Sequence, residues 1–367
     1  MTTIQGGRLA SGSRRDLHMA DGVLVADRLG GPTVDAGGHI VAPGLIDLQI
    51  NGAFGHDFTQ DPTTIWEVGR LLPELGVTGF TPTIVTSPNE VTDLAMDVVA
   101  NRRPSDYRGA EVLGLHFEGP WISPRMHGAH NPEHIVEPDL LTAQRWASSG
   151  LVRMVTLAPE LPGATEVGMA LAESGVVVSL GHTAADHDIA REALAGYAST
   201  VTHLFNQMSP MGHREPGVVG AALTSSSHCL LIADGIHVAA AILEVAWRVL
   251  GPERTILATD AMAALGLGPG TYPLGDGPIT VGDDGPRTSD GRLAGSVVTL
   301  TRAMAHLVAS TSAGLDEALL CATRNPARAL GLGRRGSLEV GGRADVVVLN
   351  EDLDVVATYV GGEQLHG

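Results

Sequence analysis

The sequence has little cysteine, no excess of basic residues and no long apolar run. Its two cysteines, Cys229 and Cys321, form no CxxC pair, which argues against a disulfide framework and against a cysteine-type zinc site. Lys and Arg number 23 against 41 Asp and Glu, a formal charge of −18, whereas nucleic acids and anionic membranes bind basic surfaces. No stretch of about 18 residues is free of polar interruption, and the N-terminus lacks the apolar segment of a secretion signal. The sequence therefore predicts a cytoplasmic protein without nucleic-acid or membrane partners.

A repeated pattern fills most of the 367 residues. A short aliphatic or β-branched run, a polar loop and an Ala- and Leu-rich segment recur, with runs beginning near residues 45, 78, 112, 152, 176, 199, 228 and 255. Runs that are apolar throughout predict strands buried on both faces, as in a parallel sheet. Eight such units predict a (β/α)₈ barrel of the TIM type. A doubly wound open sheet is the alternative, and no GxGxxG follows the first run to favour it.

The two ends of the chain differ from this pattern. Residues 1–42 alternate short polar and apolar segments with many glycines, and residues 336–367 have the composition of β-hairpins. We expect these two segments to combine into one small β-sandwich domain beside a barrel that covers residues 43–335.

Polar residues gather at the C-terminal ends of the apolar runs. They are Asp47, Gln49 and Asn51 on the first run, His116 and Glu118 on the third, His182 on the fifth, His203 and Asn206 on the sixth, Asp234 and His237 on the seventh, and Asp260 on the eighth. In a barrel these ends meet at one mouth, where active sites are built. A carboxylate and two imidazoles suit a divalent metal with a free position for water, and an aspartate on another strand would serve as general base and acid. Structural hydrogen bonds or helix caps would be the simpler explanation of each residue taken alone.

Several motifs carry a family resemblance. They are PGLIDLQING (43–52), GLHFEGPW with GAHNP (114–132), GHT (181–183), THLFNQM with REPG (202–217), IADGIHV (232–238), ATDAM (258–262), LAGS (293–296) and RADVVVLN (343–350). In order and spacing they resemble the N-acetylglucosamine-6-phosphate deacetylases of the amidohydrolase superfamily. The resemblance implies hydrolysis of N-acetyl-D-glucosamine 6-phosphate to D-glucosamine 6-phosphate and acetate, in amino-sugar catabolism and recycling.

The resemblance also implies a metal site. One divalent ion per chain would be held by Glu118, His182 and His203, with Zn²⁺ the first choice and Fe²⁺, Mn²⁺ or Co²⁺ alternatives. The superfamily usually has HxH on the first strand, where this chain has Gln49 and Asn51. Amides are weak metal ligands, so a fully occupied binuclear site is not expected, and a weak second site near His56 is left open.

Catalytic and substrate-binding residues follow from the same motifs. Asp260 would transfer protons, and His130 would contact the sugar or polarise the acetyl carbonyl. The full set of implied substrate contacts is His130, Asn206, Gln207, Arg214, His237, Ala294 and Gly295. Arg214 and His237 resemble the phosphate-binding pair, and a phosphate on so acidic a chain needs a placed cation. In the family the arginine of REPG reaches the neighbouring subunit's site, so we expect a homodimer with Arg214 acting across the interface.

The sequence pattern also fits two other functions. The chain could be an amidohydrolase for a different amide or a cyclic ureide, which an intact HxH would have favoured. It could also be a non-catalytic scaffold of the same fold, which the complete set of Glu, His, His and Asp makes a weaker alternative.

Overall fold

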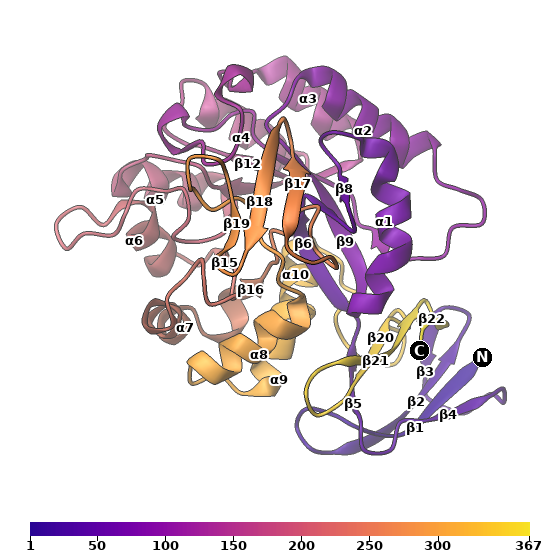
Figure 1. Ribbon diagram of the computed structural model, residues 1–367. Helices are drawn as coiled ribbons and strands as arrows, with labels where there is room; N and C mark the ends of the chain where they lie inside the picture. Colours follow the sequence, from indigo (N-terminus) through magenta and orange to yellow (C-terminus); the bar gives the residue numbers. More distant parts are fainter.

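The eight apolar runs form the strands of a parallel barrel in the computed structural model, which describes residues 1–367 (Figure 1). The strands are β6 (Leu45–Ile50), β9 (Val77–Val85), β11 (Leu115–Glu118), β12 (Val152–Leu157), β13 (Val177–Leu180), β14 (Ala198–Val201), β15 (His228–Leu231) and β16 (Thr255–Leu257). Each pairs in parallel with the next, and β10 (Glu111–Val112) adds to the start of β9. The circle closes just beyond the last strand, where the Asn51 amide donates to the Ala261 carbonyl at 2.7 Å. The predicted (β/α)₈ fold is confirmed.

Helices surround the barrel and supply the other half of its core (Figure 1). They are α1 (Ile65–Leu71), α2 (Asn89–Asn101), α3 (Leu140–Ser149), α4 (Ala164–Glu173), α5 (His187–Gly196), α6 (Gly217–Thr224), α7 (Ala240–Arg254), α8 (Leu300–Ser310), α9 (Leu315–Ala322) and α10 (Arg324–Ala329). In α3 the Asp139 carboxylate caps the first turn, Ala143 and Trp146 face the core, and Gly150 ends the helix at φ 67°. None of these helices combines the length and apolar character that a membrane span needs.

The chain termini form a separate small sheet, as predicted. Strands β1 (Thr2–Arg8), β2 (Arg14–Ala20), β3 (Val23–Val25), β4 (Thr33–Asp35) and β5 (Ile40–Pro43) join β20 (Val346–Leu349), β21 (Val355–Val360) and β22 (Glu363–His366). The order is β22-β21-β20-β5-β1-β2-β3, with β4 on β1, so the N- and C-terminal segments meet where β5 pairs with β20. The sheet has its own core of 12 buried residues. The exact domain limits stay a prediction.

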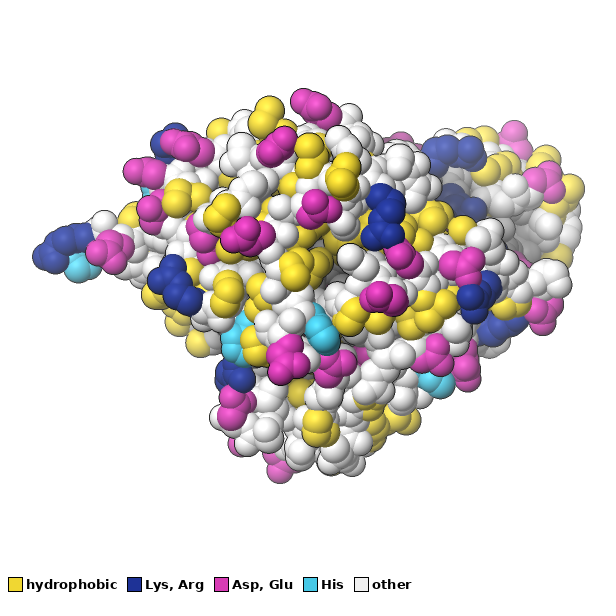
Figure 2. All heavy atoms as spheres, turned by 90° about the horizontal axis from the view of Figure 1, so that it is seen from above, with side chains coloured by type: hydrophobic (Ala, Val, Ile, Leu, Met, Phe, Trp, Pro, Cys, Tyr) yellow, Lys and Arg dark blue, Asp and Glu magenta, His cyan; other side chains and the backbone are white.

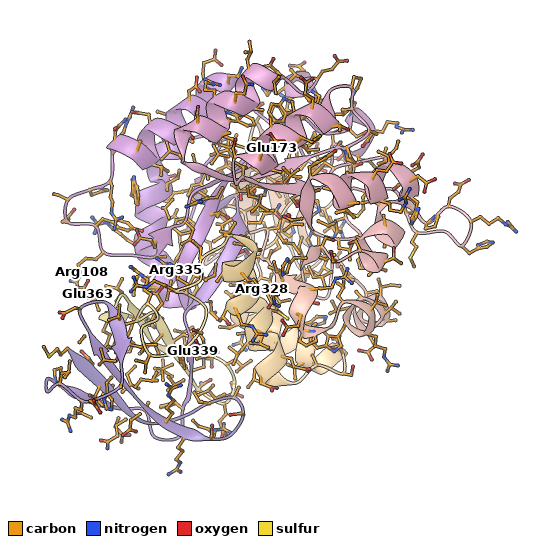
Figure 3. All side chains as sticks on the ribbon, turned by 180° about the vertical axis from the view of Figure 1, so that it is seen from behind. Arg108, Glu173, Arg328, Arg335, Glu339 and Glu363 are labelled. Atoms are coloured by element: carbon orange, nitrogen blue, oxygen red, sulfur yellow. The ribbon has the colours of Figure 1, made fainter.

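Ion pairs join the small sheet to the barrel. Arg108, between α2 and β10, reaches Glu363 of β22 at 2.6 Å, and both side chains are more than half exposed (Figure 3). Arg335 meets Asp345 at 2.6 Å where both are nearly buried. The exposed pair contributes little stability, whereas removing Asp345 would leave the nearly buried Arg335 without its charged partner. The buried pair therefore does more to fix the two parts together.

A three-stranded insertion crosses the barrel mouth, and the sequence analysis did not anticipate it. It consists of β17 (Gly270–Leu274), β18 (Gly277–Gly282) and β19 (Gly285–Arg287), which Figure 1 shows in orange in front of the barrel. Its first turn is anchored on two sides, since Asp57 accepts a hydrogen bond from the Gly275 amide and Asn131 donates to Asp276 at 2.8 Å. The insertion thereby forms one wall of the cavity at the mouth.

Candidate active site

The loops after the barrel strands direct four polar side chains to one point. Glu118 is the last residue of β11, whereas His182, His203 and Asp260 follow β13, β14 and β16. These last three residues have φ values of 48°, 27° and 50°, in the left-handed region that non-glycine residues seldom adopt. Such backbone strain is typical of functional sites, where the surrounding structure holds it in place. The strand ends thus turn sharply enough to aim three buried side chains inward.

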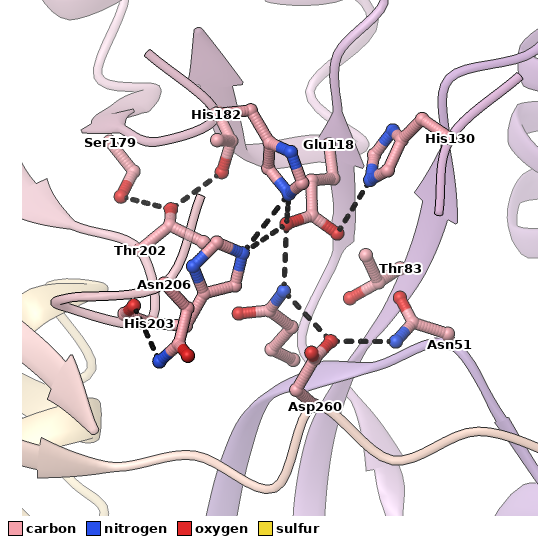
Figure 4. Close-up of polar contacts among 12 residues, drawn as sticks. Asn51, Thr83, Glu118, His130, Ser179, His182, Thr202, His203, Asn206 and Asp260 are labelled. Atoms are coloured by element: carbon pink, nitrogen blue, oxygen red, sulfur yellow. Dashed lines mark hydrogen bonds and ion pairs between the residues drawn. The ribbon is translucent and has the colours of Figure 1, made fainter. Parts of the chain in front are cut away.

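Three of these side chains form a compact triangle (Figure 4). The His203 Nε2 lies 3.0 Å from Glu118 Oε1, the His182 Nε2 lies 3.2 Å from the same oxygen, and the two nitrogens are 3.1 Å apart. All three residues are at most 4% exposed. Two imidazoles and one carboxylate oxygen therefore converge without room for another protein group between them.

The chemistry of this triangle fits a divalent cation. The His182 Nδ1 lies 2.8 Å from the Met126 carbonyl, which can only accept, so the neutral ring carries its proton on Nδ1 and a lone pair on Nε2. That lone pair faces a carboxylate oxygen, an arrangement that a cation stabilises. Tetrahedral zinc with bonds of about 2.0 to 2.1 Å has ligand atoms about 3.3 Å apart, close to the spacing found here.

His130 is a poorer third ligand than His203. Glu118, His130 and His182 form an alternative set of metal ligands, because their ligand atoms lie within 4.8 Å of one another. However, the His130 Nε2 is 3.8 Å from the nearer Glu118 oxygen, and its Nδ1 is occupied by Thr86. Burial and the neighbouring His182 ring lower the pKa of His130 well below its usual range, so the ring is neutral. It lies beside the triangle rather than in it.

Comparison with known proteins identifies the family. The amidohydrolase family model matches residues 40–365. The chain is 42% identical over 345 residues to N-acetylglucosamine-6-phosphate deacetylase of Bos taurus, covering 90% of this chain and 84% of the relative. It is 39% identical to the Homo sapiens enzyme of the same name, covering 98% and 93%. The chain belongs to the N-acetylglucosamine-6-phosphate deacetylase family.

Solved structures of the same family share the fold. The deacetylase of Pasteurella multocida superposes with a TM-score of 0.93 at 30% identity, covering 99% of both chains. An aspartate-to-alanine variant of the Mycobacterium smegmatis deacetylase, in complex with N-acetyl-D-glucosamine-6-phosphate, gives 0.89 at 34% identity, covering 100% and 99%. The resemblance read from the motifs is confirmed.

The Gln49 and Asn51 amides contact carboxylates in this family member. The Gln49 Nε2 donates to Glu118 Oε1 and to Asp260 Oδ1, both at 3.0 Å, and the Asn51 Nδ2 donates to the same Asp260 oxygen at 2.8 Å (Figure 4). Burial, together with the nearby charge of Glu118, raises the pKa of Asp260 above its usual value. The two amides offset part of that effect by donating to the ionised form.

One cavity brings together nearly all the predicted site residues. Its lining includes Asn51, Glu118, His130, His182, His203, Asn206, Gln207, His237, Asp260, Ala294 and Gly295. Gly295 sits there because its φ is 65° and a side chain would come within 3.0 Å of the Asp260 carbonyl. The LAGS segment can therefore pair with the backbone around Asp260, as the Ser296 amide does at 2.8 Å.

His237 is oriented by Asp234, which the sequence placed on the same run. The Asp234 Oδ2 accepts from the His237 Nδ1 at 2.7 Å, and the other carboxylate oxygen accepts from the amides of Ile236 and His237. Burial opposes ionisation of Asp234, but these hydrogen bonds and the His237 ring lower its pKa below the usual value. Asp234 thus caps the loop and fixes the imidazole, with the His237 Nε2 left to face the cavity.

Arg214 lies outside this cavity. It is exposed on the loop of residues 209–216, which projects beside α5 and α6 (Figure 1), and Figure 2 shows basic, histidine and acidic side chains at the tip of that projection. Arg214 borders a separate pocket that Asp186, His187 and Asp188 also line. Within one chain, therefore, Arg214 and His237 do not meet.

Sequence reasoning missed the apolar wall of the cavity. Val85, Ile232, Leu274 and Leu293 line it, and the last two belong to the insertion and the segment after it. The alternation of apolar and polar residues in GPITVGDDGPR, together with its glycines, was a sequence signal that could have predicted the hairpin.

Two further histidines lie outside the cavity. His116 is buried below the triangle, where it contacts Thr83 and Thr156, and burial lowers its pKa to about 4. His56 contacts Glu67 at 3.5 Å and is not part of the cavity.

Proposed function

We propose that the chain hydrolyses the acetamide of N-acetyl-D-glucosamine 6-phosphate, releasing D-glucosamine 6-phosphate and acetate. The observation that carries this proposal is the triangle of Glu118, His182 and His203 beside Asp260, in one cavity with His237. The relatives named for this reaction cover almost the whole chain. With this activity the chain would serve amino-sugar catabolism and recycling in the cytoplasm, where its two buried free cysteines would stay reduced.

One divalent ion per chain, with Zn²⁺ the first choice, would be held by Glu118, His182 and His203. When bound, such an ion lowers the pKa of water and withdraws charge from a carbonyl oxygen. A single tight site is supported by the hydrogen bonds of Gln49 and Asn51, whose amide nitrogens are turned toward carboxylates as donors.

Asp260 would move the proton between water and the leaving amine. Its Oδ1 accepts from Gln49 and Asn51, while none of its hydrogen bonds involves Oδ2, which stays available to take a proton. The same carboxyl group would return that proton to the amine, which cannot leave as an anion. His130, on the other side of Glu118, would donate to the acetyl oxygen as negative charge develops there.

The sugar would lie along the loop of Asn206 and Gln207, under Ala294 and Gly295, with its phosphate toward His237. We propose a homodimer in which the partner supplies the arginine of residue 214, because this side chain is exposed on a projecting loop and separate from His237. Met211, Val245 and Val249 near that loop are 52%, 46% and 49% exposed, an apolar surface suited to a subunit interface.

Acetate release tests the function directly. The purified chain should release acetate from N-acetylglucosamine 6-phosphate after metal loading, and far more slowly from unphosphorylated N-acetylglucosamine. Elemental analysis of the same sample should find close to one ion per chain. No acetate release from the loaded protein would contradict the proposed reaction, whereas two tightly bound ions would contradict only the single-metal assignment.

A further inference from the structure

His130 has an unusual neighbour on the side that faces away from the cavity. Thr86 follows the last residue of β9, is 4% exposed, and directs both its backbone amide and its hydroxyl at the His130 Nδ1. The amide nitrogen is 3.3 Å from Nδ1 and the hydroxyl oxygen is 2.8 Å from it. One ring nitrogen is thus fully occupied by a single residue.

The backbone amide decides where the ring proton lies, because a backbone N–H can donate but cannot accept. The Nδ1 atom must therefore present its lone pair to Thr86, and in the neutral ring the proton is on Nε2. The hydroxyl alone would not settle the matter, since it could accept from Nδ1 and donate onward to the Glu118 carbonyl, 3.3 Å away. A proton on Nδ1 would then point at the amide hydrogen of Thr86.

We propose that Thr86 is a positioning residue that fixes His130 as the Nε2–H tautomer. The ring then offers an N–H to the cavity and no lone pair, on the side where its Nε2 lies 3.8 Å from Glu118 Oε2. An imidazolium would bring Nδ1–H against the Thr86 amide, so His130 is unsuited to accept a proton. Resting on the proposed function, this makes His130 the donor to the acetyl oxygen and leaves proton transfer to Asp260.

The close approach of Thr86 is built into the neighbouring backbone. Gly119 follows Glu118, and a Cβ at that glycine would lie 2.1 Å from the Thr86 hydroxyl oxygen. Its φ of 87° is also in the region that glycine favours. The His130 ring also packs against the His182 ring, with the ring centroids 4.3 Å apart and the ring planes tilted by 50°. Thr86, which Gly119 allows to approach closely, therefore helps to specify both the position and the proton of His130 without lining the cavity itself.

The tautomer can be measured without turnover. We expect long-range ¹⁵N–¹H correlation spectra of ¹⁵N-histidine-labelled, zinc-loaded protein to show His130 with an unprotonated Nδ1 and a protonated Nε2. The His130 signals are assigned by their loss in His130→Gln. An Nδ1–H pattern for His130 in the parent protein would overturn the proposal, whatever the activity of the enzyme.

Kinetics of Thr86 variants supply the second test. Thr86→Val keeps the shape and the amide but removes the hydroxyl, and we expect kcat to fall about 2- to 12-fold, the effect of one neutral hydrogen bond, with KM little changed. Thr86→Ser keeps both donors and should stay within about twofold of the parent in kcat. Parental kcat in Thr86→Val would overturn the role of the hydroxyl.

Thr59→Val is the matched control, because the Thr59 hydroxyl accepts from the Val85 amide at 3.0 Å and does not touch His130. We expect it to leave the tautomer unchanged and kcat within about twofold of the parent. If kcat falls as much in Thr59→Val as in Thr86→Val, the loss in both variants comes from disturbed packing at the end of the strand, and the positioning role of Thr86 is overturned. If the parent protein releases no acetate at all, the proposed reaction fails while the measured tautomer still decides the assignment of Thr86.

Discussion

Replacing Gln49 with methionine tests how the site holds its two carboxylates. The Gln49 amide nitrogen donates to Glu118 and to Asp260, and hydrogen bonds to charged groups contribute about 1.5 to 3 kcal/mol each. Methionine fills a similar volume and donates nothing. We expect metal affinity and kcat/KM each to fall about 10- to 100-fold, as is usual when a partner of a metal ligand is lost.

We expect Gln49→Met to lose metal affinity and activity without a matching loss of thermal stability. The Gln49 Oε1 is buried without a hydrogen-bond partner, so the methionine also removes an unsatisfied acceptor. Asp260 Oδ1 keeps Asn51 as a donor, and Glu118 Oε1 keeps its contact with His203. We therefore expect the melting temperature to stay within a few degrees of the parent while metal binding weakens.

Competition with a chromophoric chelator measures the metal affinity, and acetate release gives kcat/KM. Thr81→Val is the control, because the buried Thr81 hydroxyl donates to the Leu48 carbonyl in the same part of the barrel and touches neither carboxylate. It should lose stability and keep its metal. The reasoning is refuted if Gln49→Met binds metal and turns over within about threefold of the parent.

Four further outcomes are expected. Asp260→Asn should keep its metal but lose about 10²- to 10⁴-fold in kcat, since an amide cannot take the proton; more than about a tenth of parental kcat contradicts the assignment. Asp234→Asn removes the charged partner of His237, so kcat/KM should fall about 10-fold or more for the phosphorylated sugar only, and equal losses on both sugars would indicate misfolding. Burial raises the pKa of Asp47 to about 7, so between about pH 4 and pH 7 the unfolded chain has released this proton while the folded chain keeps it. The free energy of unfolding therefore falls as the pH rises through this range, by up to about 1.4 kcal/mol per pH unit. Asp47→Asn should not lose stability over this pH range. If the difference in melting temperature between the parent and Asp47→Asn is the same at about pH 5 and about pH 7, the assignment of this pH dependence to Asp47 is wrong. Finally, Asp260→Ala and Arg214→Ala chains should regain activity as verified heterodimers, because one of the two sites then has both groups. Activity no higher than the average of the two homodimers would mean that Arg214 acts within its own chain or does not act on the phosphate.

The sequence was most informative about the barrel strands. Most residues of these strands are buried, so apolar residues dominate each run, and the functional residues come at the run's end, where the loop begins. Glu118, His182, His203 and Asp260 could be assigned to one mouth for that reason. A single repeated constraint therefore specified both the fold class and the place of the site.

The insertion and Thr86 were missed for a different reason. Strands β17 to β19 form a local three-stranded antiparallel sheet that packs on the mouth from outside, and nothing in the barrel periodicity requires it. Thr86 acts mainly through its backbone amide, which every residue but proline has, so the residue type carries almost no signal. Arg214 shows a third limit, because its motif carries the phosphate assignment while within one chain its side chain borders a pocket separate from the cavity.

The Gln49 and Asn51 positions show how two amides can change the chemistry of a strand end. A histidine there would turn a lone pair inward, whereas these amide nitrogens turn hydrogens inward, toward Glu118 and Asp260. That side of the site presents hydrogen-bond donors, which fits the proposal that Glu118, His182 and His203 alone would hold the ion. Because both amides bond the same Asp260 oxygen, the carboxylate is fixed in one orientation with Oδ2 free. The two amides on which the single-ion proposal rests thereby also orient the group proposed to carry the proton.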